Sequence, residues 1–189
     1  ALDGADGVVM AVPTKGLRRT IEECESVLKA SSAYLITCKG FESRSGSLPF
    51  QILESIVPKA SYAVLSGPSF AKDVGEKKPT LVSLAAGDRS VSDTFADALF
   101  EGGVRTYFNH DVIGVSVGGA TKNVIAIAAG MGSALGIGAS AIAALVTRGL
   151  SEISRLGVAL GAERETFMGL SGMGDLSLTC FTWFSILFS

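Results

Sequence analysis

The sequence predicts an α/β fold in which a sheet of parallel strands precedes a wholly helical region. Short apolar runs alternate with amphipathic helical patterns as far as about residue 110. From Asp111 onward no strand pattern returns, and the stretch from Val124 to Thr147 carries no ionisable side chain. We therefore expect one domain over residues 1–110 and a second, helical domain over residues 111–189.

The composition narrows the class of protein. A chain of 189 residues with 48% hydrophobic residues can bury a substantial core. Its net charge of -2 argues against non-specific binding to nucleic acid. Three widely spaced cysteines and a single histidine indicate neither a disulfide framework nor a zinc site, so we expect no metal and a reducing compartment.

The predicted elements follow in order. A continuous apolar run that ends at Pro13 is typical of a strand covered on both faces. Leu17 begins an amphipathic helix with apolar residues at three- and four-residue steps. Ser90 is placed as the N-cap of a later helix, with Asp93 completing a capping box. The full prediction is strands at 8–12, 34–38, 62–65, 80–86 and 104–108, and helices at 17–28, 48–57 and 90–100.

Three of these strands end in residues that suit a ligand. Parallel strands joined by crossover helices present their carboxyl ends at one edge of a sheet, which is where such folds bind ligands. The segments expected to meet there are Pro13-Thr14, Lys39-Gly40 and Gly67-Pro68-Ser69. A cation, a hydroxyl group and free amides at one edge favour an anionic or polyol ligand.

Lys122 lies directly before the uncharged run. Its ammonium group is either solvated along the aliphatic stem or held where its charge is used. The 24 uncharged residues of the run are long enough to span a membrane. However, four glycines between 130 and 138 make a break between two buried helices of a soluble domain the better interpretation.

A glycine-rich stretch, Gly169-Leu170-Ser171-Gly172-Met173-Gly174-Asp175, surrounds one carboxylate. Asp175 is either an ordinary helix N-cap or a group presented to another surface by a loop that can approach it closely. Two lysines and this aspartate around one cleft could bind an oxyanion and move a proton.

Six segments together resemble one family, the NAD(P)-dependent glycerol-3-phosphate dehydrogenases in their bacterial and plastid form. They cover most of residues 5 to 180 in the family's order and spacing. The segments are VVMAVP, CKGFE, VLSGPSFAKDV, DVIGVSVGGATKNVIAIAAGM, ALVTRGLSEISRLGVALGA and ETFMGLSGMGDLSLTC.

The resemblance implies a partial Rossmann-type parallel sheet that binds NAD or NADP, followed by an all-α substrate domain like that of 6-phosphogluconate dehydrogenase. It implies interconversion of dihydroxyacetone phosphate and sn-glycerol 3-phosphate, in glycerophospholipid precursor synthesis. Lys122 matches the family's catalytic lysine, and Lys39 matches a lysine shared between substrate and nicotinamide. The other matching positions are Gly67, Ser69, Asn123, Asp175 and Thr179 on the substrate and Ala71 on the cofactor.

The sequence also departs from the family. The glycine-rich pyrophosphate loop, expected before residue 1, is absent, and FTWFSILFS follows Cys180 where the family supplies an arginine for the substrate phosphate. We therefore expect a fragment that is weak or inactive. The alternatives are a 6-phosphogluconate or other hydroxyacid dehydrogenase, and a non-catalytic remnant that binds a partner or self-associates through an unpaired sheet edge.

The expected partners follow from the same resemblance. They are the small phosphorylated substrate and, as a homodimer, a second copy of the chain, with no nucleic acid and no transmembrane segment. The expected location is the cytoplasm, or a plastid if the source is a plant or alga.

Overall fold

A five-stranded sheet forms the first part of the molecule, in the order β1-β2-β3-β4-β5. The computed structural model describes residues 2, 5–29 and 32–187, with side chains in the last helix as far as Phe181. The strands are β1 (Gly7–Met10), β2 (Ala33–Ile36), β3 (Ser61–Ser66), β4 (Thr80–Ala86) and β5 (Val104–Asn109). The α/β class and the five predicted strands are confirmed, and the structure adds a short helix between β3 and β4 that the sequence did not predict.

Helices cover both faces of this sheet. The helix α1 (Thr14–Cys24) and the helix α2 (Pro49–Ile56) lie on one face, where they share a core with Tyr34 and Ile36 of β2. On the other face Leu35 packs with Phe95 of α4 (Arg89–Glu101). The alternation of Tyr34, Leu35 and Ile36 between the two cores is the period of two that a buried strand requires.

The prediction of a wholly parallel sheet is wrong for one pair of strands. β1, β2 and β3 are parallel, and β4 is parallel to β5, but β3 and β4 are antiparallel. The connection between β3 and β4 contains only the five-residue helix α3 (Ala71–Gly75). Parallel strands are normally joined by a crossover helix that carries the chain back along the strand, and this connection has no helix long enough for that, so the chain reverses at the same edge.

The prediction for the start of α4 is also wrong. Asp88, not Ser90, is the N-cap, and its carboxylate accepts a hydrogen bond of 2.9 Å from the Ser90 backbone nitrogen. An aspartate two residues earlier offers a stronger acceptor than the serine hydroxyl. Asp93 instead approaches Arg89, with 3.9 Å between the nearest nitrogen and oxygen.

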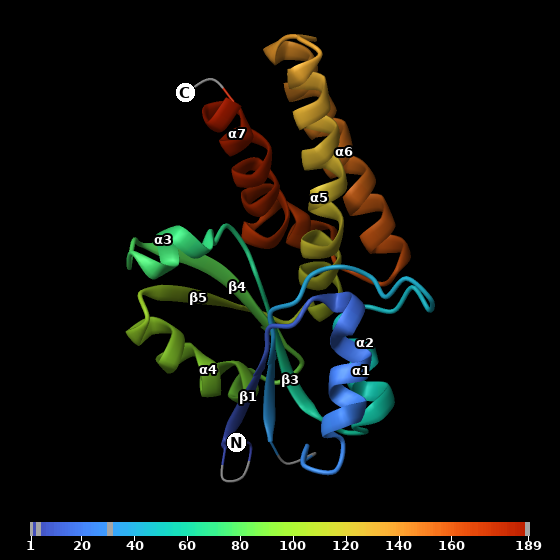
Figure 1. Ribbon diagram of the computed structural model, residues 1–189, viewed down its shortest axis with the longest axis vertical. Helices are drawn as coiled ribbons and strands as arrows, with labels where there is room; N and C mark the ends of the chain where they lie inside the picture. The colour runs from blue at the N-terminus through green and yellow to red at the C-terminus, as the bar shows by residue number, and fades with distance from the viewer. Residues whose placement is uncertain (1, 3–4, 30–31, 188–189) are drawn as a thin grey trace.

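The helical region contains α5 (Val112–Ala134), α6 (Ala139–Ala159) and α7 (Asp175–Leu187), which project together from one edge of the sheet (Figure 1). The predicted break lies at residues 135–138, where Gly136 and Gly138 have positive φ angles of 68° and 88°. Gly132 lies inside α5 and not in this break. A Cβ there would be 2.7 Å from the Ile137 side chain, so the packing favours glycine.

The two helices are less buried than the uncharged run predicts. Val124, Ile127, Met131 and Leu135 are each more than 60% exposed. Among the described residues α5 is the one helix long and apolar enough to cross a membrane, and 44% of its most apolar window is buried inside the protein. The core helix of a soluble protein can have the same length and apolar composition.

Asp111 joins the sheet to the helices. It is the N-cap of α5, and its carboxylate accepts hydrogen bonds from the Gly114 nitrogen (2.7 Å), the Glu163 nitrogen (2.8 Å) and the Thr166 hydroxyl (2.7 Å). Its own nitrogen donates to the Asn109 side chain at the end of β5. Through its buried carboxylate and its backbone nitrogen, this one residue links β5, α5 and the short 3-10 helix η1 (Arg164–Met168).

The aromatic end of the chain continues α7 through Leu187. Phe181 is 50% exposed. The side chains of the FTWFSILFS segment from residue 182 onward lie outside the described residues.

Candidate active site

The carboxyl ends of β1, β2 and β3 meet as predicted. Thr14, which begins α1 just after β1, donates its hydroxyl to the Lys39 carbonyl oxygen at 3.0 Å. Gly67 follows β3 with a φ of +150°, and a Cβ there would be 3.0 Å from the Val82 Cα. The turn after β3 therefore requires glycine for both its conformation and its close approach to β4.

Three charged groups from distant parts of the chain meet at this edge. Lys39 follows β2, Lys122 lies in α5, and Asp175 begins α7. The Lys39 Nζ lies 2.7 Å from Asp175 Oδ2, and the Lys122 Nζ lies 2.5 Å from Asp175 Oδ1. Lys122 is therefore held by a buried partner and is not solvated along its stem.

The cluster is buried to different depths. The side chain of Asp175 is 2% exposed, that of Lys122 is 13% exposed and that of Lys39 is 25% exposed. Each carboxylate oxygen accepts one charge-assisted hydrogen bond, which offsets the cost of burying the charges. Two cations and one anion leave a local excess of positive charge, which favours an anionic ligand.

Glycines in α5 make the cluster possible. A Cβ at Gly118 would be 2.4 Å from the Ser171 carbonyl oxygen, and a Cβ at Gly119 would be 2.8 Å from the Ser66 hydroxyl. Such distances are too short for any side chain. The absence of side chains at both positions lets α5 approach both β3 and the loop that carries Asp175.

The glycine-rich stretch before Asp175 is a single turn of π-helix, η2 (Leu170–Gly174). Its wide turn is closed by a bond of 3.1 Å from the Gly174 nitrogen to the Gly169 carbonyl oxygen. A Cβ at Gly172 would be 2.1 Å from the Phe167 carbonyl oxygen, so only glycine fits there. Single π turns are frequent at functional sites, and this one turns the chain so that Asp175 faces both lysines.

The protonation of Lys39 follows from its surroundings. Burial lowers the pKa of its ammonium group, the Asp175 carboxylate opposes that change, and the Lys122 charge adds to it. Cys180 is close enough to Lys122 for that charge to act against the burial that raises the pKa of its thiol. The site can therefore hold one proton close to several acceptors, which acid–base chemistry requires.

The other predicted residues lie around this cluster at varying depth. The Ser69 hydroxyl donates to the Gly67 carbonyl oxygen at 3.1 Å, and Ala71 is exposed at the start of α3. Thr179 donates its hydroxyl to the Asp175 carbonyl oxygen at 2.7 Å within α7, so that its proton is used in the helix. Asn123 is exposed, beside Lys122 in α5.

Asn123 and Thr179 line a groove of about 580 Å³ between α5 and α7, whose remaining lining is apolar. The groove is therefore wide enough for a small molecule and next to the cluster. The part of the chain that the structure describes contains no group of three or more His, Cys, Asp or Glu side chains that could hold a metal ion.

Sequence reasoning missed two kinds of residue at the site. Ser66 has a buried hydroxyl with no partner among the described residues, at the point where Gly119 passes it. Arg18 and Glu42 hold the loop after Lys39 from outside the cluster. The only sequence signal for Glu42 is its place in the CKGFE segment.

Comparison with known proteins covers nearly the whole chain. Residues 1–92 match the family model described as the N-terminus of NAD-dependent glycerol-3-phosphate dehydrogenase, and residues 111–185 match the model of its C-terminus. Curated relatives include the glycerol-3-phosphate dehydrogenase [NAD(P)+] of Dechloromonas aromatica, 51% identical over 95% of this chain, and that of Nitrosomonas europaea, 48% identical. The chain spans 55% of the length of each.

The crystal structure of glycerol-3-phosphate dehydrogenase from Coxiella burnetii superposes with a TM-score of 0.90 at 36% identity, over 95% of this chain and 55% of that one. A mainly parallel sheet followed by helices therefore places the chain in the fold class of this dehydrogenase. Within that class the chain belongs to the NAD-dependent glycerol-3-phosphate dehydrogenase family.

Proposed function

We propose that this chain carries the catalytic half of an enzyme that interconverts dihydroxyacetone phosphate and sn-glycerol 3-phosphate with NAD or NADP. The observation that carries the proposal is the buried contact of Lys39 and Lys122 with Asp175 at the carboxyl ends of the strands. We divide the chain into a nicotinamide-binding part, 1–110, and a substrate-binding part, 111–189. The family match favours this substrate over the 6-phosphogluconate alternative.

Lys122 is the acid–base group in this proposal. When bound, the nicotinamide ring supplies the redox chemistry by accepting a hydride. During oxidation of the substrate alcohol, the C–H bond of the carbinol carbon breaks and its hydride goes to that ring. Neutral Lys122 takes the hydroxyl proton, and a C=O bond forms. In the reverse direction the Lys122 ammonium polarises the ketone and returns the proton. Asp175 orients that ammonium and limits its movement, because it is nearly fully buried.

Lys39 lies between the two binding regions. We propose that its side chain, which is more exposed than that of Lys122, contacts both the substrate and the nicotinamide. Gly67, Ser69, Asn123 and Thr179 are proposed to contact the substrate. Ala71 lies exposed at the same sheet edge, so a cofactor bound across this edge would reach both it and Lys39. These positions support the proposal that Lys39 and Ala71 would hold the nicotinamide end of the cofactor.

Purified chain tests this proposal by oxidation of NADH or NADPH with dihydroxyacetone phosphate. Lys122→Ala should lower turnover about 100-fold or more, the usual contribution of a general acid–base group. Lys59→Gln, an exposed substitution just before the amino end of β3, is the matched control and should leave turnover unchanged. Equal turnover in parent and Lys122→Ala would contradict the assignment. Substrate binding without turnover in the parent would favour a non-catalytic remnant.

The remaining partner and location proposals have separate support. Exposed Val9 on β1, which is an edge strand of the described sheet, and the exposed apolar residues of α5 support a homodimer. Sedimentation velocity over a range of concentrations tests it. The contacts of α5 with β3, α6 and α7 support its assignment as a core helix and not a membrane span. The bacterial source of the relatives supports a cytoplasmic location and gives no support to a plastid.

A further inference from the structure

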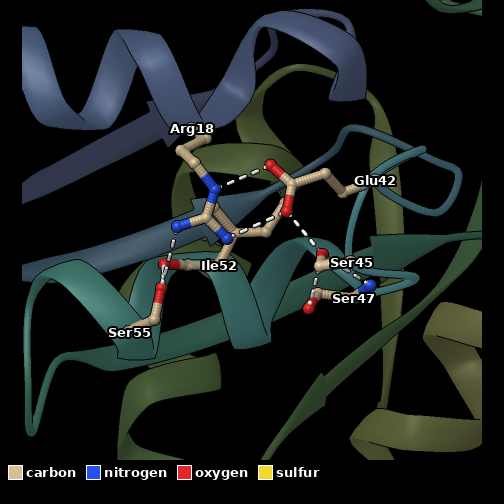
Figure 2. Close-up of polar contacts among 6 residues, drawn as sticks. All are labelled: Arg18, Glu42, Ser45, Ser47, Ile52 and Ser55. Carbon is tan, nitrogen blue, oxygen red and sulfur yellow. Dashed lines mark hydrogen bonds and ion pairs between the residues drawn. The ribbon is translucent and has the colours of Figure 1, made fainter.

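Arg18 of α1 grips the loop that begins at Lys39. Its Nε donates to Glu42 Oε1 at 2.7 Å and its Nη2 donates to Glu42 Oε2 at 2.9 Å, so both carboxylate oxygens are held (Figure 2). A two-point contact of this kind fixes orientation as well as distance. The third nitrogen, Nη1, lies 3.4 Å from the Ser55 hydroxyl of α2. One side chain therefore ties this loop to two helices.

The loop is closed on itself beyond that contact. The Glu42 nitrogen donates to the Ser47 carbonyl oxygen at 2.9 Å, and the Gly46 nitrogen donates to the Glu42 carbonyl oxygen at 2.8 Å. The Ser45 hydroxyl donates to Glu42 Oε2 at 2.5 Å and accepts from the Ser47 nitrogen at 3.1 Å (Figure 2). Residues 42–47 form one compact turn, and the Glu42 carboxylate is its attachment to α1.

The helix α1 holds this segment at two points. Thr14 and Arg18 are four residues apart and so lie on one face of the helix. Thr14 binds the Lys39 carbonyl oxygen and Arg18 binds Glu42, with only Gly40 and Phe41 between. Gly40 has a φ of +128°, which residues other than glycine rarely adopt, and glycine is also the residue with the greatest backbone freedom. The second contact therefore fixes the loop beyond its most permissive residue.

We propose that Arg18 and Glu42 are a positioning pair that keeps the Lys39 ammonium against Asp175. The inference rests on the proposed function for its catalytic meaning, although the positioning itself is a property of the chain alone. The pair acts through the backbone, because the groups that shift the pKa of Lys39 are its burial, Asp175 and Lys122, and not Glu42.

Amine labelling tests the positioning without any need for catalysis. Trace acetic anhydride followed by peptide mass spectrometry reports the reactivity of Lys39 relative to exposed Lys59 in the same molecule. Glu42→Gln keeps the side-chain volume but weakens the grip of Arg18. It should raise the relative labelling of Lys39 by about fivefold, a size in keeping with partly exposed ion pairs. Arg18→Met should raise the labelling of Lys39 to the same extent. Arg18→Lys keeps the charge but cannot bind both carboxylate oxygens at once, so the labelling of Lys39 should be intermediate between the parent and Arg18→Met.

The chain offers a matched control on the same helix. Arg19 and Glu23 of α1 have the same 2.7 Å contact between Nε and Oε1, but their side chains are 85% and 59% exposed and hold no loop. Arg19→Met and Glu23→Gln should leave Lys39 labelling at the parental value. An equal increase in these controls would overturn the proposal.

A double-mutant cycle separates positioning from general loosening. Asp175→Asn already releases the Lys39 ammonium, so adding Glu42→Gln should then raise labelling less than about twofold. An undiminished effect in that background, or parental labelling in folded Glu42→Gln, would overturn the proposal. Global unfolding of Glu42→Gln, seen by circular dichroism, would also overturn it, because the pair would then support the whole fold and not one lysine.

Turnover is a separate measurement. Where the parent chain turns over, Glu42→Gln should lower kcat more than it changes the KM for NADH. A parent chain without turnover agrees with the expectation of a weak or inactive fragment and leaves the labelling result to decide the positioning, whereas turnover that is unchanged in Lys122→Ala contradicts the proposed function alone.

Discussion

At the scale of single residues, one carboxylate determines the state of the candidate site. The whole Asp175 residue is 1% exposed, and its carboxylate accepts hydrogen bonds from two ammonium groups that lie far from it in sequence. Removal of one partner from a buried ion pair leaves charge in a poorly solvated place. Here both lysines depend on the same oxygens, so the loss of this one charge affects two cations at once.

The first prediction concerns this carboxylate. Asp175→Asn should lower the free energy of unfolding by about 3 kcal/mol, because the charges of Lys39 and Lys122 then repel each other without compensation. Urea unfolding followed by circular dichroism measures the change. Asp73→Asn is the control, since its contact of 2.9 Å with Lys78 is largely exposed and should matter little. Similar losses in both variants would contradict the prediction.

A second prediction at this scale concerns pH. Hydrogen bonds from Arg18, and then from Ser45, lower the pKa of Glu42 from 4.5 to about 2. A depressed folded-state pKa stabilises the protein above the unfolded value and loses that effect as the pH falls. The stability difference between the parent and Glu42→Gln should therefore be constant above pH 4.5 and disappear as the pH approaches 2. Urea midpoints measured across this range give the answer, and a difference that persists at the acid end would contradict it.

At the scale of elements, α5 is the part of the chain on which the site is built. Its uncharged composition reflects two different constraints. Near its start, Gly118 and Gly119 remove side chains where the helix meets other backbone. Near its end, Gly130 meets nothing within 4 Å. The same residue type is therefore required for packing in one turn and unfavourable for the helix in another.

Alanine at position 118 and alanine at position 130 should have opposite effects on the free energy of unfolding. Gly118→Ala brings a Cβ to 2.4 Å from the Ser171 carbonyl oxygen, and the forced shift should cost about 1–3 kcal/mol. Gly130→Ala should instead stabilise the protein by about 0.5–1 kcal/mol, because alanine favours the helix more than glycine does and its Cβ would meet nothing within 4 Å. Thermal unfolding of both variants measures this. Destabilisation by both substitutions would show that the helix end packs more tightly than the structure indicates.

At the scale of the whole molecule, the sheet and the helices are joined by buried contacts rather than by a flexible linker. The Asp111 carboxylate connects the start of α5 with η1 through three hydrogen bonds, and the Asp111 backbone nitrogen donates to the Asn109 side chain at the end of β5. Lys39 and Asp175 connect the same two regions at the candidate site. The two regions should therefore unfold together.

Loss of Asp111 should uncouple them. Asp111→Ala leaves two buried nitrogens and a hydroxyl without their acceptor and should cost about 3 kcal/mol or more. Hydrogen exchange followed by mass spectrometry should then show peptides of α5 and α6 opening independently of β4 and β5. Asp88→Ala, which removes an exposed N-cap from α4, should give a smaller loss without this separation. Uniform exchange across the molecule in Asp111→Ala would contradict the prediction.

From the sequence alone we predict the five strands, most of the helices and the three charged residues of the candidate site, but not Ser66, whose hydroxyl is buried there. Periods of two and of about 3.6 residues report which local conformation buries apolar side chains, and Lys39, Lys122 and Asp175 each stand out beside such patterns. Tertiary structure alone decided the antiparallel pairing of β3 with β4, the joining role of Asp111 and the grip of Arg18 on Glu42. These features depend on the span of a short connection and on contacts between residues distant in sequence, which no local period records.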